Sequence, residues 1–125
     1  MIKIISTKSA PTVIGPYSQA LVVNNFVFCS GQIGIDPKTG VLTPGVQSQI
    51  KQTLNNLKAV LEASGSSLNQ VVKTTVYIKN MSDYPLFNKI YGEFFNSNKP
   101  ARATVEVSRL PKDCLIEIDA IAVKN

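Results

Sequence analysis

A chain of 125 residues, 44% of them hydrophobic and 17% charged, is long enough to build one hydrophobic core and too short for two. We therefore expect a single domain over residues 1–125. Two cysteines are too few for a disulfide scaffold. The net charge of +5 comes from lysines dispersed along the chain, which argues against the clustered charge of a nucleic-acid-binding face.

The apolar segments of the sequence argue against a membrane protein. No apolar run approaches the roughly 20 residues that span a bilayer, and residues 1–5 lack the charged and then apolar layout of a signal peptide. Cys29 and Cys114 lie in apolar stretches, where a thiol is usually a small buried hydrophobe. We expect a cytoplasmic protein in a reducing compartment.

The first predicted elements are strands. Residues 18–23 and 26–30 are β-branched and apolar on either side of two asparagines, which tolerate positive φ, so this segment predicts a β-hairpin. A short strand is expected from Gln32 to Ile35. The sequence Asp-Pro-Lys-Thr-Gly at residues 36–40 predicts the turn that ends it.

Two helices are predicted next. From Val46 to Leu61 the apolar positions step by four or three, which is the spacing of one helical face, and Gly65 supplies a stop. A second helix is expected from about Tyr84 to Phe95, with Pro85 in its first turn. Its cap would be Ser82 or Asp83, and its apolar stripe consists of Phe87, Ile90, Tyr91 and Phe94.

Three further strands complete the pattern. Residues 72–79 alternate between apolar and polar side chains, and strands are also expected at 102–108 and 115–123, with a turn at 111–113 between the last two. The order predicts an α+β fold, a mixed sheet with two helices on one face. We expect the other face to carry the polar residues of the last two strands, Arg102, Thr104, Glu106, Ser108, Glu117 and Asp119.

That open face would also carry Leu115, Ile121 and Val123. A sheet face with both apolar residues and charges is seldom left in water, so we expect a second subunit to cover part of it.

The absence of histidine excludes many catalytic sites. Ser-His-Asp and Cys-His nucleophiles, histidine-based ribonuclease pairs and histidine metal sites all need a residue that the chain lacks. The segment from Ser30 to Gly34 contains two glycines but not the third glycine or the lysine of a phosphate-binding loop. We expect no cofactor and no metal.

Arg102 is the leading candidate for a functional residue. An arginine near the start of a strand, facing the same way as Thr104 and across a tight turn from Glu117, can bind a carboxylate with its forked N–H groups. The alternative is a structural ion pair with Glu106 or Glu117. Arg109, seven positions further on, would face the other side and lie on the surface.

The other polar candidates each have an ordinary structural interpretation. Glu117 and Asp119 could form salt bridges at a subunit edge. Tyr17 could cover a ligand or close a sheet edge. Asn88 fits a solvent-facing helix position, and Thr104 by itself fits an ordinary strand.

Several segments of the chain, in order, resemble the reactive intermediate deaminase family, also called enamine/imine deaminases. The segments are Gly15-Pro16-Tyr17-Ser18, Ser30-Gly31-Gln32, Val72-Lys73-Thr74-Thr75-Val76, residues 100–107 (PARATVEV), Leu110-Pro111-Lys112-Asp113 and Ile116-Glu117-Ile118. The resemblance implies a chorismate-mutase-like α+β fold and a homotrimer with clefts between subunits. It further implies hydrolysis of 2-iminopropanoate and 2-iminobutanoate to 2-keto acids and ammonia.

The resemblance also implies roles for residues. Arg102 would bind the substrate carboxylate and Glu117 would orient or activate water. The residues that would line the cleft are Tyr17, Gly31, Asn88 and Thr104. Thr104 stands where many relatives have cysteine, and Lys99 stands where others have an apolar residue.

Two alternative functions stay open. One is an endoribonuclease or translation-inhibiting RNA binder, a role also attached to members of the family, although dispersed lysines and the lack of histidine argue against nucleic acid as a partner. The other is a non-catalytic binder of small carboxylates that uses the same arginine.

Overall fold

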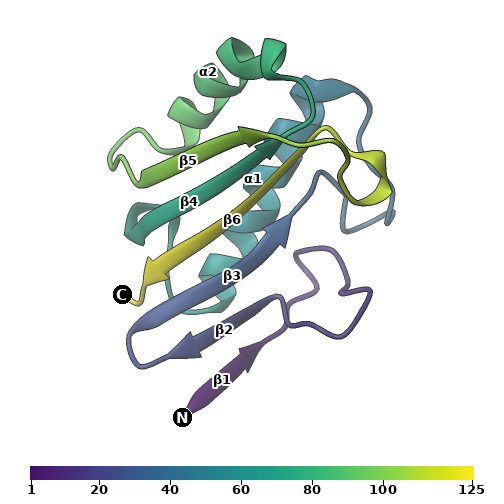
Figure 1. Cartoon of the computed structure of the whole chain (residues 1–125). Coiled ribbons are helices and arrows are strands. Elements are labelled where there is room, and N and C mark those ends of the chain that lie inside the picture. Colours follow the sequence, from purple (N-terminus) through teal and green to yellow (C-terminus); the bar gives the residue numbers. More distant parts are fainter.

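Six strands form one mixed sheet in the order β1-β2-β3-β6-β4-β5 in the computed structural model, which describes residues 1–125. Two helices cover one face, and Figure 1 views the sheet from its open face, with α1 behind it. The strands are β1 (Ile2–Ile5), β2 (Ala20–Val23), β3 (Phe26–Gln32), β4 (Val71–Ile78), β5 (Ala101–Glu106) and β6 (Ile116–Val123); the helices are α1 (Gly45–Ala63) and α2 (Tyr84–Phe94). The predicted α+β fold is confirmed.

The core lies between the sheet and the helices. The predicted apolar face of α1 is buried, and Ile50, Leu54 and Leu57 have no exposed surface. Complete burial of such a side chain contributes roughly 1.5 to 3 kcal/mol. Helix α2 begins at Tyr84, with Pro85 in its first turn as predicted, and buries Phe87 against the same core.

The predicted hairpin and the turn after it are confirmed. Strands β2 and β3 are antiparallel, and Asn24 between them has a φ of 53°. In the turn, the backbone N–H of Gly40 donates to the carbonyl oxygen of Asp36 at 2.8 Å. The separate strand expected from Gln32 to Ile35 is wrong, because β3 itself runs on to Gln32 and Ile35 makes only an isolated bridge to Leu42.

Strand β4 starts one residue earlier than its sequence pattern indicates. Val71 is buried and Val72 is 45% exposed, because the pairing of β4 with β6 shifts register between Val71 and Lys73. A bulge of this kind inserts one unpaired residue and reverses the alternation locally. The regular alternation predicted for residues 72–79 is therefore wrong at Val72, while Thr74, Val76 and Ile78 follow it and are buried.

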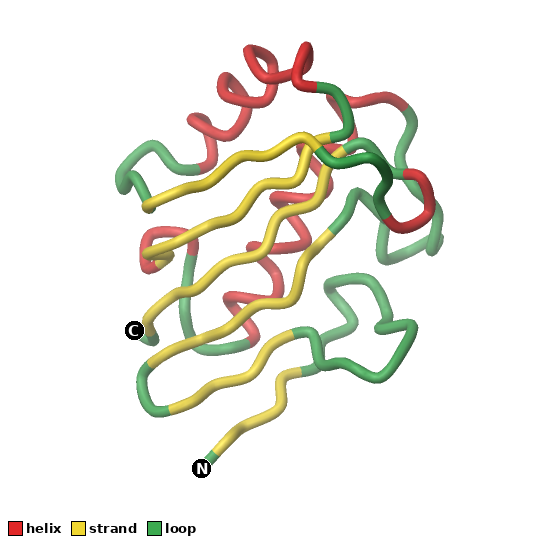
Figure 2. Tube along the Cα trace, in the orientation of Figure 1, coloured by secondary structure: helices red, strands yellow, loops and turns green.

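The last two strands are not neighbours, which corrects the predicted turn between them. Strand β4 lies between β5 and β6 and runs parallel to β5 and antiparallel to β6. Residues 107–115 form the loop that leads from the end of β5 past β4 to β6, as Figure 2 shows. Arg102 pairs with the buried Thr74 on the helix side, whereas Glu117 pairs with Tyr77 on the open side.

The expectation that Arg102, Thr104 and Glu106 share the open face with Glu117 and Asp119 is therefore wrong. Alternation fixes which residues of a strand share a side but not which side meets the helices. The long stem of an arginine and its planar head can lie against aromatic rings, so a charged residue is tolerated on the helix side at the margin of the sheet.

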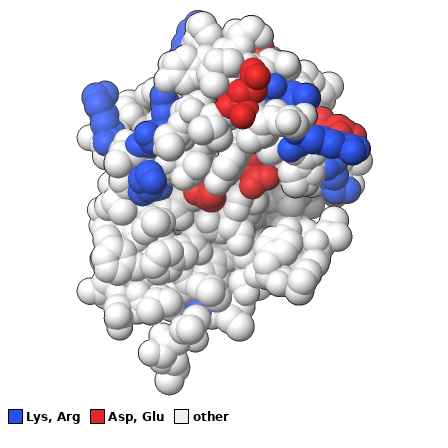
Figure 3. Space-filling model, in the orientation of Figure 1, with Lys and Arg blue, Asp and Glu red and all other residues white.

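The open face carries few charges over β1, β2 and β3. In Figure 3 the Lys, Arg, Asp and Glu side chains of this view gather over the upper part of the molecule, which holds α2, β4, β5, β6 and the loop after β5. Phe26 and Phe28 of β3 are 47% and 44% exposed, and Val105 of β5 is 43% exposed.

Neither helix combines the length and the apolar character that crossing a membrane requires.

Candidate functional site

The guanidinium of Arg102 rests on aromatic rings of α2. Its central carbon lies 4.8 Å from the ring centroid of Tyr91, 5.5 Å from that of Phe87 and 5.6 Å from that of Tyr84. Such contacts stabilise a cation electrostatically. Arg102 also donates a hydrogen bond from Nη2 to the phenol oxygen of Tyr84 at 2.8 Å.

Arg102 forms no ion pair, contrary to the structural alternative considered for it. Glu106 instead accepts a hydrogen bond from the backbone N–H of Met81 at 2.8 Å, and Glu117 lies on the other face of the sheet. The single ion pair of the chain joins Arg109 and Asp113, both exposed, at 2.7 Å. The charge of Arg102 is therefore uncompensated and available to an anion.

Asn88 and Thr104 lie in the same region as Arg102. Thr104 follows Arg102 on the same side of β5, and its hydroxyl oxygen is buried without a hydrogen-bond partner. Asn88 is half-buried on α2. A hydrogen bond from Asn88 and the neighbouring charge of Arg102 lower the pKa of the Tyr84 phenol below its ordinary value of 10.0.

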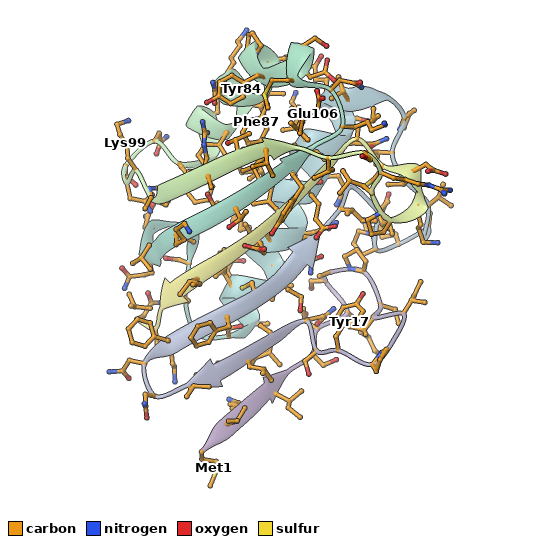
Figure 4. All side chains as sticks on the ribbon, in the orientation of Figure 1. Met1, Tyr17, Tyr84, Phe87, Lys99 and Glu106 are labelled. Atoms are coloured by element: carbon orange, nitrogen blue, oxygen red, sulfur yellow. The ribbon has the colours of Figure 1, made fainter.

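A second region lies on the opposite side of the sheet from Arg102. A pocket of about 280 Å³ is enclosed by the loop that leads to β2, the end of β3 and the loop before β6. Its lining includes Tyr17, Gly31 and Glu117. Tyr17 is 53% exposed at its rim, and Figure 4 shows it on the loop next to β2.

Gln19 fixes the wall of this pocket. Its buried side chain accepts a hydrogen bond from the backbone N–H of Thr7 at 2.6 Å and donates to the carbonyl oxygens of Thr7 and Pro11 at 3.0 and 2.9 Å. A buried amide with three bonds holds the loop in one conformation. The aliphatic side chains of Val13 and Ile14 are thereby placed beside the pocket.

Glu117 lies directly against Gly31. A Cβ atom at residue 31 would lie 2.1 Å from Oε2 of Glu117, so only glycine leaves room for the carboxylate. Burial, with a smaller contribution from the charge of Asp119, raises the pKa of Glu117. Neither acid forms the predicted salt bridge, and Asp119 accepts a hydrogen bond from the phenol of Tyr77 at 3.2 Å.

The structure thus divides the six predicted site residues into two groups. Arg102, Thr104 and Asn88 belong to the margin of the sheet beside α2, and Tyr17, Gly31 and Glu117 belong to the pocket beside β3. Residues on opposite faces of one sheet cannot contact the same small molecule within one copy of the chain. Each group can nevertheless serve as half of a site.

Sequence reasoning missed two residues near these groups. Tyr84 was expected only as the start of a helix, since nothing in its spacing indicates that its phenol reaches Arg102. Lys112 lines the pocket with a φ of 55°, a left-handed conformation that a lysine adopts rarely and that a Pro-Lys-Asp sequence does not reveal.

Comparison with known proteins gives the relationships of the chain. The family model described as Endoribonuclease L-PSP matches residues 7–124. A RutC family protein of Pyrococcus horikoshii is 57% identical over 126 residues, and the 2-iminobutanoate/2-iminopropanoate deaminase of Salmonella typhimurium is 48% identical over 128 residues; both matches cover 100% of each chain.

A solved structure shows the same fold. The crystal structure of Escherichia coli TdcF with bound serine superposes with a TM-score of 0.95 and 43% identity, covering 98% of this chain and 99% of the other. The family model spans nearly the whole chain, and the relatives match at high identity from end to end. The chain therefore belongs to the YjgF/RidA (RutC, L-PSP) family.

Proposed function

We propose that this protein hydrolyses short 2-imino acids, 2-iminopropanoate and 2-iminobutanoate, to 2-oxo acids and ammonia. The observation that carries the proposal is an arginine without an ion pair, Arg102, in a chain 48% identical along its whole length to a deaminase of that name. An uncompensated guanidinium is suited to a carboxylate, which every such substrate carries. A pocket of about 280 Å³ fits a molecule of that size.

We further propose that the complete site forms between copies of the chain in a homotrimer. The margin with Arg102 would meet the neighbouring copy's pocket with Glu117 and Tyr17. Contacts between unlike surfaces close into a ring when each copy is rotated by the same angle, and three copies give three equal clefts. The exposed Phe26 and Phe28 and the half-exposed Val105 are apolar surface that such an assembly would cover.

The proposed chemistry needs only orientation and one base. Arg102 holds the carboxylate, so that C2 of the protonated imine faces Glu117. Glu117 accepts a proton from water while the water oxygen forms a bond to C2, which gives a carbinolamine. The proton then passes to the amino nitrogen, the C–N bond breaks and ammonia leaves; loss of the hydroxyl proton completes the 2-oxo acid.

The position of Glu117 supports its assignment as the base. Its carboxylate is half-buried, and a raised pKa makes it a stronger base than a carboxylate in water. A protonated imine is already electrophilic, so neither a metal nor a histidine is needed to activate it.

A non-catalytic carboxylate binder is the main rival function, and Glu117 distinguishes it from an enzyme. If the protein is an enzyme, replacement of Glu117 by Gln should abolish turnover but leave ligand binding intact. If it is a binder, the replacement should leave its ligand affinity unchanged. RNA binding is less favoured, because the basic side chains visible in Figure 3 lie in separate groups with acidic ones between them and form no continuous band.

The proposal is tested by coupling the protein to a threonine dehydratase and trapping the released imine with semicarbazide. Wild type should suppress trapping, while Arg102→Ala should not. Lys58→Ala, which removes a positive charge from the exposed side of α1, is the matched control and should behave as wild type. Unchanged trapping with wild type would contradict the deaminase assignment for these substrates.

A further inference from the structure

Tyr84 is the residue that most directly contacts Arg102, and none of the roles assigned above accounts for it. It opens α2, and Figure 4 shows it on that helix beside Phe87. Its phenol oxygen accepts a hydrogen bond from Nη2 of Arg102 at 2.8 Å, and its ring is one of the three aromatic rings that contact the guanidinium.

We propose that Tyr84 is the positioning residue for Arg102, and that its phenol oxygen fixes the guanidinium in the orientation that receives the substrate carboxylate. This inference rests on the proposed binding of a carboxylate by Arg102. A free arginine side chain has several rotatable bonds, and ordering them on binding weakens affinity. A guanidinium already held by Tyr84 loses less freedom when the ligand arrives.

The hydrogen-bonding capacity of the two groups supports this role. A guanidinium has five N–H donors, and the bond to Tyr84 uses one of them, so the others are left for a carboxylate. The ring centroids of Phe87 and Tyr91 lie 5.5 and 4.8 Å from the central carbon of the same guanidinium, but these rings supply no directional bond to it. The phenol oxygen of Tyr84 is the group that sets its rotation.

The contact also predicts a pH dependence that a purely structural tyrosine would not produce. Asn88 is the polar group on its own helix, Arg102 of β5 is the charged group that faces the phenol, and both lower the pKa of Tyr84. Asp83 precedes it, and Glu106 bonds to the turn before α2. Ionised Tyr84 would compete with the ligand for Arg102, so carboxylate affinity should fall as the pH rises through this pKa.

The test measures binding of 2-oxobutanoate, the expected product, by calorimetry. Tyr84→Phe keeps the ring and removes the oxygen. We expect its dissociation constant and KM to rise about 3- to 10-fold, with kcat within about twofold of wild type, since the ligand must then order a guanidinium that Tyr84 no longer holds. The alkaline loss of affinity seen in wild type should disappear in this variant.

Absorbance at 295 nm supplies a second readout, because the chain has four tyrosines and no tryptophan. Tyr84 is the one whose pKa is lowered, while those of Tyr77 and Tyr91 are raised by burial. Tyr84→Phe should remove the earliest ionisation step, 2-oxobutanoate should shift that step to higher pH, and Tyr77→Phe should leave it in place.

The outcomes separate this inference from the proposed function. Binding that depends on Arg102 and Tyr84 without hydrolysis of imine would support the inference and overturn the deaminase proposal. Tyr84→Phe that binds 2-oxobutanoate as tightly as wild type, or that keeps the alkaline loss of affinity, would overturn the inference whatever the turnover. A wild type that hydrolyses imine while Tyr84→Phe leaves both KM and kcat unchanged would overturn the inference and leave the deaminase proposal standing.

Discussion

The carboxylate of Glu117 occupies the space that a side chain at residue 31 would need. A Cβ on Gly31 would lie 2.1 Å from Oε2 and 2.8 Å from Cδ of Glu117. Strand β3 therefore carries a glycine where the side chain of Glu117, the proposed base, projects from β6. The residue type at position 31 therefore determines whether the carboxylate of Glu117 can occupy the place that the proposed chemistry needs.

Gly31→Ala should reduce turnover much more than stability. The atoms in the way belong to the end of a flexible side chain, so Glu117 can rotate aside at little cost to the fold, but its carboxylate then leaves the water position. We expect kcat/KM to fall about 100-fold, the scale of losing a positioned base. Steady-state kinetics and thermal melts measure both effects.

Gly34→Ala is the contrasting variant. A Cβ there would lie 2.8 Å from the backbone Cα of Gln49 in α1, which cannot move aside as a side-chain end can. Its melting temperature should drop clearly. Equal losses of stability in the two variants would contradict the local role assigned to Gly31.

The rate should depend on the ionisation of Glu117. Because burial and Asp119 raise its pKa above 4.5, the base is lost at a higher pH than for an ordinary glutamate. The value of kcat/KM should fall as the pH decreases through that raised pKa. Asp119→Asn should move this decrease in kcat/KM to lower pH. Because burial is the larger cause of the raised pKa, the variant should reverse only part of the pKa shift. A pH profile unchanged by Asp119→Asn would argue against an effect of Asp119 on Glu117.

The ionised form of Glu117 should also reduce the stability of the folded protein at neutral pH. Its pKa is higher in the folded chain than in the unfolded one, so the folded state binds more protons between the two values, and stability falls as the pH rises through that window. Glu117→Gln removes the half-buried charge and should raise the melting temperature at pH 7. The gain should shrink near pH 4, where the carboxyl is protonated; Glu62→Gln, exposed on α1, should show no such gain.

The two cysteines should be inert in the folded protein. Both are free and buried, and burial raises the pKa of Cys29 to about 12 and that of Cys114 to about 11. Thiolate is the reactive form. Iodoacetamide at pH 8 should label neither until guanidinium unfolds the chain, as mass spectrometry would show; rapid labelling of the folded protein would refute this.

The elements of the fold were largely predictable because they depend on local patterns. The face of α1, the hairpin at Asn24 and Pro85 in the first turn of α2 follow from spacing and from backbone preferences. The bulge at Val72 and the edge strand β1 were missed. Residue type shows neither an inserted residue nor a short strand that is stabilised mainly by pairing with β2.

The arrangement of the site was less predictable than its residues. The sequence singled out Arg102 and Glu117, but their faces depend on strand order, and a turn-like Pro-Lys-Asp segment suggested neighbouring strands where β4 in fact intervenes. The contact between Arg102 and Tyr84 joins residues 18 positions apart through tertiary packing, for which local spacing carries no signal.

Complementation between two inactive variants tests the shared site most directly. Arg102→Ala keeps Glu117, and Glu117→Gln keeps Arg102. Co-refolded at equal amounts, they should recover about a quarter of wild-type turnover, because random assembly into a ring pairs an intact Arg102 with a neighbour's intact Glu117 at one interface in four. Mixed variants that form assemblies but stay as inactive as each alone would contradict a site built from two copies of the chain.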